Sequence, residues 1–206
     1  MKQYIAIIIL TLCLVSCSHH SKHWETLISV ESIMEERPDS ALAVLQSIEI
    51  GDLSSKEEKG KRALLLSIAL DKNEIRQTDF EILDPAIDYY KENGSSTEQM
   101  LTLFYQGQIH RINSQYAQAL TCFCDAIKIS DAPSNIHTIA RVYDAQGDVY
   151  KSLAKWNETI KSKLFAADCF SKLDNTDYCV SALLDVFYSY TQEGDFINAE
   201  KYLNEC

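Results

Sequence analysis

Residues 103–129 read LFYQGQIHRINSQYAQALTCFCDAIKI, and they carry the clearest structural pattern in the chain. Gly107 is followed twelve residues later by Ala119, and Phe123 and Ala126 come after it. Because Gly107 and Ala119 lack bulk, two antiparallel helices can approach each other closely at these positions. The ring of Phe123 then fills the seam towards the next pair of helices. The stretch therefore predicts a closely packed helical hairpin.

This arrangement of small and aromatic residues resembles the tetratricopeptide repeat (TPR), in which a glycine on the first helix meets a small residue on the second. Two further copies are indicated forty residues apart, because Gly147 occupies the glycine position and Ala199 the small position. Ala119, Thr159 and Ala199 are spaced by 40 and 40 residues. The common repeat is about 34 residues long, so the resemblance implies hairpins of a long-helix variety.

Three positions depart from the repeat pattern. Thr159 stands where alanine is expected, Lys163 where an aromatic residue is expected, and Phe187 where glycine is expected. These departures leave an ordinary helical bundle with accidental periodicity as the alternative. The regular spacing favours the repeat, so we predict an all-α, TPR-like superhelix (solenoid) of about five helical hairpins over residues 24–206.

Capping and breaking residues indicate where helices start in the first half of the chain. Ser55-x-x-Glu58 predicts a capping box at the start of one helix. Thr78-x-x-Glu81 has the same spacing and suggests a further start, although Pro85 must kink that helix or delay it.

The first residues have the organisation of a bacterial signal peptide. Lys2 supplies a positive charge, and the run of twelve apolar residues from Tyr4 onward is too short for a membrane span, which needs roughly 20 residues. It fits a signal-peptide core of roughly 7–15 residues. The run ends with LVSC at positions 14–17, which resembles the lipobox of bacterial lipoproteins. We therefore predict a lipoprotein signal peptide over residues 1–16.

In lipoproteins of this kind, signal peptidase II cleaves before the cysteine, which is then acylated. The resemblance implies cleavage between Ser16 and Cys17 and a membrane anchor on Cys17, because several acyl chains give lasting attachment. An ordinary secretory signal or an uncleaved anchor, with Cys17 uninvolved, is the alternative. Residues 17–23 would be the acylated cysteine and a flexible polar tether. Ser18 does not resemble the aspartate inner-membrane retention signal, so we expect a periplasm-facing lipoprotein, with the outer membrane favoured.

Charge and composition exclude some classes of protein. The formal net charge is −11, and it becomes −12 when residues 1–16, with Lys2 as their one charged side chain, are removed. Such an excess of negative charge repels phosphate backbones, so we expect no nucleic-acid partner. Six glycines and three prolines are few for a β-sandwich with its many tight turns.

Residue patterns typical of catalysis are absent from the sequence. It contains no phosphate-binding glycine loop, no G-x-S-x-G and no H-E-x-x-H. His110 and His137 are isolated, and His19, His20 and His23 are more typical of a solvated linker than of a metal site. We therefore expect no enzyme activity, no cofactor and no bound metal.

Five cysteines remain once the signal peptide is removed and Cys17 is acylated. They are Cys122, Cys124, Cys169, Cys179 and Cys206. Cys169 and Cys179 flank a turn and could meet across it if their Cα atoms lie within about 7 Å. Because the number is odd, not all of them can pair, and we favour buried free thiols that pack as small hydrophobic side chains. The sequence leaves the disulfide open.

The TPR resemblance also implies a concave groove lined by the first helix of each hairpin. It places the following residues near that surface: Phe104, Gln108, Arg111, Arg141, Asp144, Asp148, Lys151 and Tyr188. Mixed charge with aromatic side chains suits the binding of a peptide or a helix from a partner protein. The function predicted from the sequence is therefore a membrane-anchored scaffold or adaptor.

Two other functions stay open. The stretches 36–42, 63–66 and 69–73 resemble lipobox-bearing TPR proteins of Gram-negative anaerobes. Longer members of that set continue into a transmembrane helix and a cytoplasmic helix-turn-helix domain, so this chain could be the periplasmic sensory part of a truncated regulator. The end of the chain has no evident polar capping helix, which indicates a truncation or a docking surface. A nutrient- or glycan-binding lipoprotein is the third alternative.

Overall fold

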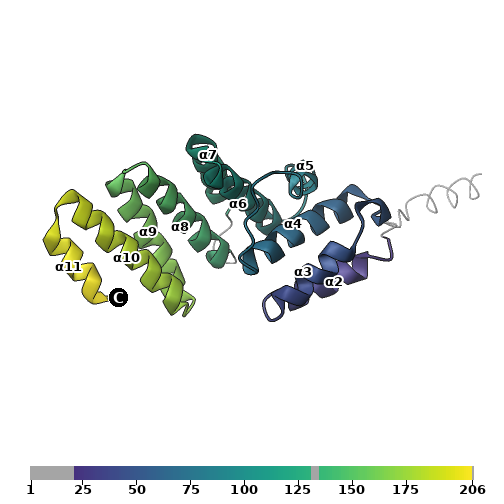
Figure 1. The fold of residues 1–206 in the computed structure, drawn as a ribbon, viewed down its shortest axis with the longest axis horizontal. Helices are drawn as coiled ribbons and strands as arrows, with labels where there is room; N and C mark the ends of the chain where they lie inside the picture. The colour runs from purple at the N-terminus through teal and green to yellow at the C-terminus, as the bar shows by residue number, and fades with distance from the viewer. Residues whose placement is uncertain (1–20, 131–134, 206) are drawn as a thin grey trace, which may run out of the picture.

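The computed structural model describes residues 21–130 and 135–205, and every regular element within these two ranges is helical (Figure 1). The elements are α2 (Trp24–Ile33), α3 (Pro38–Ser47), the 3-10 turn η1 (Ile50–Asp52), α4 (Lys56–Lys72), α5 (Asp84–Tyr90), α6 (Ser96–Ile112), α7 (Tyr116–Ile129), α8 (Ile136–Ser152), α9 (Trp156–Lys172), α10 (Thr176–Glu193) and α11 (Phe196–Glu205). The predicted all-α fold is confirmed.

The helices form five hairpins that follow one another in a row, from α2 and α3 in purple to α10 and α11 in yellow (Figure 1). Each helix packs against the next one along the chain, and the first helices α2, α4, α6 and α8 also pack against one another in turn. In a globular bundle, helices that are distant in sequence would pack together as well. The stack is therefore a solenoid, as the period of forty residues predicted.

The backbone repeats with the same period. Glu74, Ser114, Ala154 and Gly194 follow the first helices of four successive hairpins, and all four have positive φ angles, of 58°, 59°, 53° and 77°. These residues are spaced by forty positions. A left-handed residue reverses the chain after a helix, so the hairpin turns are equivalent although only one of them uses glycine.

Two capping boxes start the first helices of the second and third hairpins. The predicted box at α4 is confirmed, because Ser55 Oγ accepts the Glu58 N–H at 3.1 Å and Glu58 accepts the Ser55 N–H. The box at α6 was not predicted. There Ser95 Oγ accepts the Glu98 N–H at 3.3 Å, and Glu98 Oε2 accepts the Ser95 N–H at 2.8 Å.

The helix start suggested at Thr78-x-x-Glu81 is wrong. Asp79 Oδ1 accepts the Glu81 N–H at 3.1 Å in a turn, and α5 begins only at Asp84. Pro85 lies in the first turn of α5, where its missing N–H breaks no helical hydrogen bond. Pro85 therefore delays the start of α5, so the helix is short and the connection between α4 and α5 is long.

The carboxylate of Glu58 joins the start of α4 to the beginning of the described chain. It is fully buried, and it accepts hydrogen bonds from Ser54 N at 2.6 Å, Ser54 Oγ at 2.8 Å and Ser21 N. Burial is the largest single effect and raises the pKa of Glu58. The hydrogen bonds from Ser54 and Ser21 outweigh it and lower the pKa from 4.5 to about 2.

This depressed pKa predicts acid sensitivity. Stability that comes from ionised Glu58 is present above its unfolded-state pKa and is lost as the pH falls from about 4.5 towards 2. We expect Glu58→Gln to cost about 2–3 kcal/mol at pH 7 and much less near pH 2. Urea unfolding followed by circular dichroism at both pH values would measure the difference, and an equal cost at both would contradict the assignment.

Candidate peptide-binding groove

Two adjoining cavities lie along the face formed by α4, α6 and α8. The first has a volume of about 650 Å³ and the second about 490 Å³. Asp71, Glu74 and Gln108 line both, so the two are compartments of one groove. The second compartment also reaches the turn before α3 and the start of α10. Cavities of this size accommodate several side chains of a bound segment.

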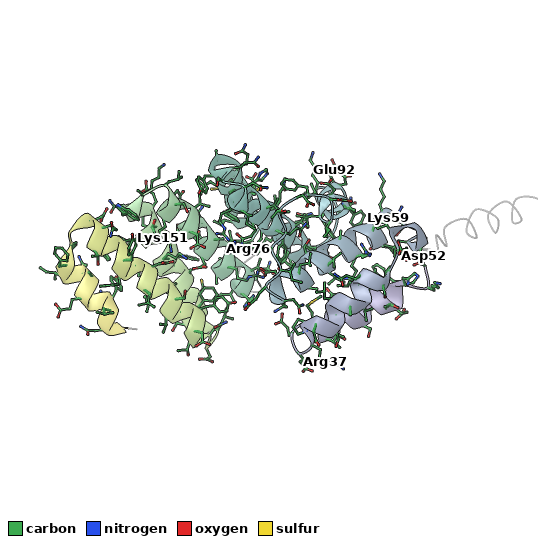
Figure 2. All side chains as sticks on the ribbon, in the orientation of Figure 1. Arg37, Asp52, Lys59, Arg76, Glu92 and Lys151 are labelled. Atoms are coloured by element: carbon green, nitrogen blue, oxygen red, sulfur yellow. The ribbon has the colours of Figure 1, made fainter. Side chains whose placement is uncertain are left out.

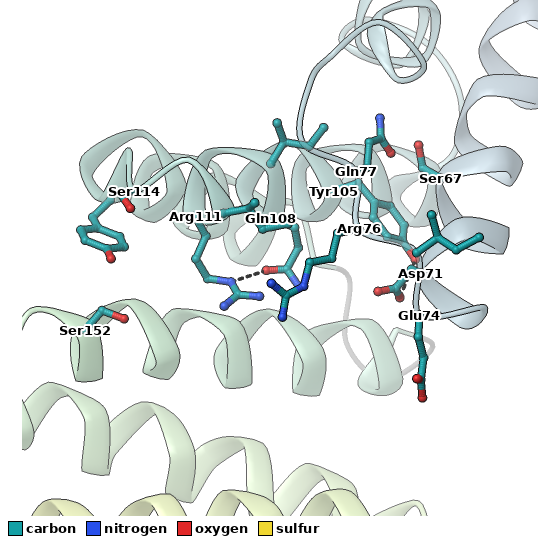
Figure 3. Close-up of a pocket in the computed structure, with 14 residues that line it drawn as sticks. Ser67, Asp71, Glu74, Arg76, Gln77, Tyr105, Gln108, Arg111, Ser114 and Ser152 are labelled. Carbon is teal, nitrogen blue, oxygen red and sulfur yellow. Dashed lines mark hydrogen bonds between the residues drawn. The ribbon is translucent and has the colours of Figure 1, made fainter.

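The first compartment contains two arginines (Figure 3). Arg111 of α6 donates from Nε to Gln108 Oε1 at 2.8 Å, and its Nη1 lies 3.7 Å from Asp148 Oδ2. Arg76, from the connection after α4, points towards Gln108 (Figure 3) and forms no ion pair within the described part of the chain. Ser67 also lines this compartment, and its buried hydroxyl has no hydrogen-bond partner among the described residues.

A second group of side chains ties three first helices together. Arg141 of α8 forms an ion pair with Asp71 of α4 at 2.5 Å, although the two are 70 residues apart. The hydroxyl of Tyr105 on α6 donates to Asp71 Oδ2 at 3.3 Å. The Arg141 guanidinium also lies 4.4 Å from the ring centre of Phe104, within range of a cation–π interaction. These contacts cross the floor of the second compartment.

Lys163 lies on α9, the second helix of its hairpin, and contacts groove-lining aspartates of α8. Its Nζ lies 2.6 Å from Asp144 Oδ1, 2.7 Å from Asp148 Oδ1 and 2.9 Å from Asp185 Oδ2. Its methylene chain lies over Gly147, where an added Cβ would come within 2.8 Å of Lys163 carbons. The stem therefore fills the position that Phe123 fills over Gly107, while the ammonium group joins three carboxylates.

Burial and the attraction between Lys163 and the three aspartates shift pKa values within this cluster in opposite directions. Burial lowers the pKa of Lys163, but the three aspartates together raise it above its ordinary value. Burial also raises the pKa of Asp144, and Lys163 only partly offsets that effect. Asp185 has a lowered pKa, because Lys163 and Lys151 outweigh its burial. The cluster is thus a network of paired opposite charges beneath the groove, in which Lys163 is shared by three carboxylates and Asp185 also pairs with Lys151.

Solved structures with the same fold support this description. The chain matches the structure titled "MamA AMB-1 C2221" with a TM-score of 0.54 and 16% identity, over 85% of this chain and 90% of that one. It matches BtubC from P. vanneervenii with a TM-score of 0.56 and 17% identity, over 87% of this chain and 71% of that one. This is a TPR-like α-helical solenoid. No family model and no curated protein matches the sequence.

The solenoid places most of the predicted groove residues together. Those that line the second compartment are Phe104, Gln108, Arg141, Asp144 and Asp148, and Arg111 lines the first. Lys151 lies beside them in an ion pair with Asp185 at 2.5 Å. Tyr188 lines neither compartment; its ring packs at 5.9 Å from that of Trp156.

Phe104 lines the second compartment from its floor. It is only 2% exposed and belongs to the hydrophobic core, so it supports the groove from below rather than presenting its ring to a partner. Its ring is buried because Arg141 covers it on the groove side and Phe123 packs against it from α7. A helical position alone does not show which neighbour covers a side chain.

Sequence reasoning missed several groove residues. Asp71, Arg76, Tyr105, Lys163 and Asp185 were not predicted to belong to it. Arg76 lies outside the helices, so no periodic pattern could identify it. Lys163 was noted only as a departure from an aromatic position, and the glycine sixteen residues before it was the available signal.

The residues predicted to pack the repeats are all buried. They are Gly107, Ala119, Phe123, Ala126, Gly147 and Ala199. Cys122, Cys124, Cys169 and Cys179 are free thiols. Ser16, Cys17, His19, His20 and Cys206 lie outside the described residues. Among the helices that are described, none has the length and apolarity needed to cross a bilayer.

Proposed function

We propose that this protein is a lipid-anchored scaffold whose groove binds a segment of a partner protein. The observation that carries the proposal is the continuous polar groove, built by side chains from successive first helices. The first compartment offers the guanidinium group of Arg76, which forms no ion pair within the described chain. The carboxylates that line the second compartment, Glu35, Asp144 and Asp148, are already paired with lysine or arginine side chains. A segment that presents an acidic side chain to Arg76 would therefore complement this groove.

The proposed function also includes attachment to a membrane through Cys17. The sequence at positions 14–17 resembles a lipobox, so we infer that Cys17 holds the protein on the periplasmic side of a bacterial membrane. We expect Cys17→Ser to abolish labelling by an alkyne-tagged fatty acid and to move the protein out of the membrane fraction. Continued labelling of that variant would refute the anchor, and an unchanged solenoid would be verified by circular dichroism.

Site-specific photocrosslinking tests the groove. A benzophenone side chain placed at Gln108, between the two compartments, should yield a defined crosslinked partner in intact cells. The same group placed at Glu92, after α5 and away from the groove residues (Figure 2), should not. Equal adducts from both positions would mean that the groove is not the binding surface.

Reversing one exposed charge sharpens that test. Arg76→Glu should reduce the Gln108 adduct about tenfold, the change that a loss of about 1.4 kcal/mol produces. Arg76 forms no ion pair in the described chain, so the variant should keep its fold. Lys91→Glu makes the same charge change at the exposed end of α5, which lines neither compartment, and should leave the yield unaltered. Equal yields from the two variants would exclude Arg76 from recognition.

A further inference from the structure

The described chain begins with residues that are held on the body of the solenoid. The Ser21 N–H donates to the buried carboxylate of Glu58, and Ser21 O accepts the Trp24 N–H at 3.2 Å. His23 N donates to Ser21 Oγ at 3.1 Å, and His23 Nε2 lies 3.7 Å from Asp52 Oδ2. The segment 21–23, expected from the sequence to be part of a flexible tether, is therefore bound to α4 and η1.

Side-chain packing holds the next residue as well. Trp24 packs against the hydrophobic cluster shared by α2, α3 and α4. The ammonium group of Lys61 lies 5.9 Å from the centre of the Trp24 ring and 2.8 Å from Glu31. Glu58 accepts several hydrogen bonds and is fully buried, so releasing Ser21 would leave a buried carboxylate less well satisfied.

This attachment limits the distance between the body and a lipid on Cys17. Only residues 18–20 separate Cys17 from Ser21. Four Cα-to-Cα steps span at most about 14 Å when fully extended. A tether that stayed free as far as Trp24 would reach about 25 Å by the same measure. The fixed Ser21 therefore removes nearly half of the reach.

We propose that the N-terminal end of the solenoid, formed by residues 21–24 and 49–58, lies directly against the bilayer that holds the anchor. The inference rests on the proposed acylation of Cys17. Glu35 and Asp71 line the groove at the opposite ends of α2 and α4 from this contact. The groove therefore begins about one helix length, roughly 25 Å, from the bilayer. The partner segment bound there is then a membrane-proximal one.

The two tryptophans of the chain make the proposal testable, because Trp24 lies at the proposed contact and Trp156 lies on α9. Acylated full-length protein is reconstituted into vesicles of phosphatidylethanolamine and phosphatidylglycerol that contain a dansyl-headgroup lipid. Trp156→Phe isolates energy transfer from Trp24, and Trp24→Phe isolates transfer from Trp156. We expect transfer from Trp24 to be several-fold more efficient.

A linker variant provides the matched control. Twelve glycine and serine residues inserted between His20 and Ser21 add an average span of about 19 Å and should reduce transfer from Trp24 severalfold. Equal transfer from the two tryptophans, or no effect of the linker, would overturn the proposal. The intact mass of the protein shows whether Cys17 is acylated. An unacylated chain would refute the lipid anchor, whereas an acylated chain with equal transfer would refute only the contact between the solenoid and the bilayer. Circular dichroism verifies that each variant is folded.

Discussion

Replacing Lys163 by methionine is expected to destabilise the solenoid by about 3–5 kcal/mol, the usual cost of removing one partner from a buried ion pair. Lys163 is 2% exposed and holds Asp144, Asp148 and Asp185 at distances below 3 Å. Methionine keeps the unbranched stem over Gly147, so the packing loss is small. The loss of stability in this variant therefore reports the removal of the buried ammonium group that the three carboxylates share.

The pH dependence separates this explanation from a packing defect. Without Lys163 the carboxylate of Asp144 loses the positive charge that partly offsets its burial, so its pKa in the folded variant should lie above that in the unfolded chain. Groups of this kind bind more protons when folded, and the variant should regain stability as the pH falls from 7 towards 4. Urea unfolding at both values measures the change. A cost that is the same at both pH values would contradict the charge explanation.

A nearby lysine serves as the control. Lys161 lies on the same helix and is exposed, so Lys161→Met removes an equal charge from the surface. That variant should change stability by no more than about 0.5 kcal/mol. Lys163→Phe would restore the aromatic residue expected from the repeat. It should be destabilising too, because it removes the one cation that pairs with Asp144 in the described chain and leaves Asp148 and Asp185 with Arg111 and Lys151 alone. A stable Lys163→Phe protein would show that the repeat pattern, and not the cluster, governs this position.

The second large effect is expected at Gly107, which we predict cannot accept leucine without a loss of about 3 kcal/mol. An added Cβ at Gly107 would lie 2.4 Å from Cε1 of Phe123. The Phe123 ring is fully buried and packs against Phe104, so it has no free space in which to move. The additional carbons of leucine would force α6 and α7 apart.

A double-mutant cycle tests that explanation. Phe123→Ala alone should cost about 3–5 kcal/mol through the cavity that it leaves. Combined with Gly107→Leu it should cost clearly less than the sum, because the leucine occupies part of that cavity. Thermal and urea unfolding of the four proteins give the coupling energy. Additive effects would mean that the two side chains do not compete for the same space.

Gly51 offers a matched control for the glycine substitution. It lies in the exposed η1 turn, and apart from its chain neighbours no atom of the described residues lies within 4 Å of where its Cβ would be. Its φ angle is not in the left-handed region. Gly51→Leu should therefore fold normally, and a loss similar to that of Gly107→Leu would indicate a general intolerance of leucine rather than close helix packing.

Much of the fold could be read from local patterns. The capping box at Ser55 and the small residues at Gly107 and Ala119 depend on neighbours within one hairpin, and the sequence displays those neighbours directly. The hairpin turns were less visible. Glu74, Ser114 and Ala154 share the left-handed conformation of Gly194 without sharing its chemistry. Their conformation follows from the hairpin that surrounds them rather than from their own preference.

Sequence patterns predicted most of the helices, the period of forty residues and the excess of negative charge, but not the late start of α5 at Asp84. The tertiary structure alone decided which charges meet. Arg141 pairs with Asp71 from 70 positions away, and Lys163 joins aspartates from two different helices. Helix formation depends on residues a few positions apart, so the spacing of apolar residues in the sequence indicates where helices form. The partners of a groove side chain depend on how successive hairpins turn about the superhelix axis, and that rotation arises only when they pack.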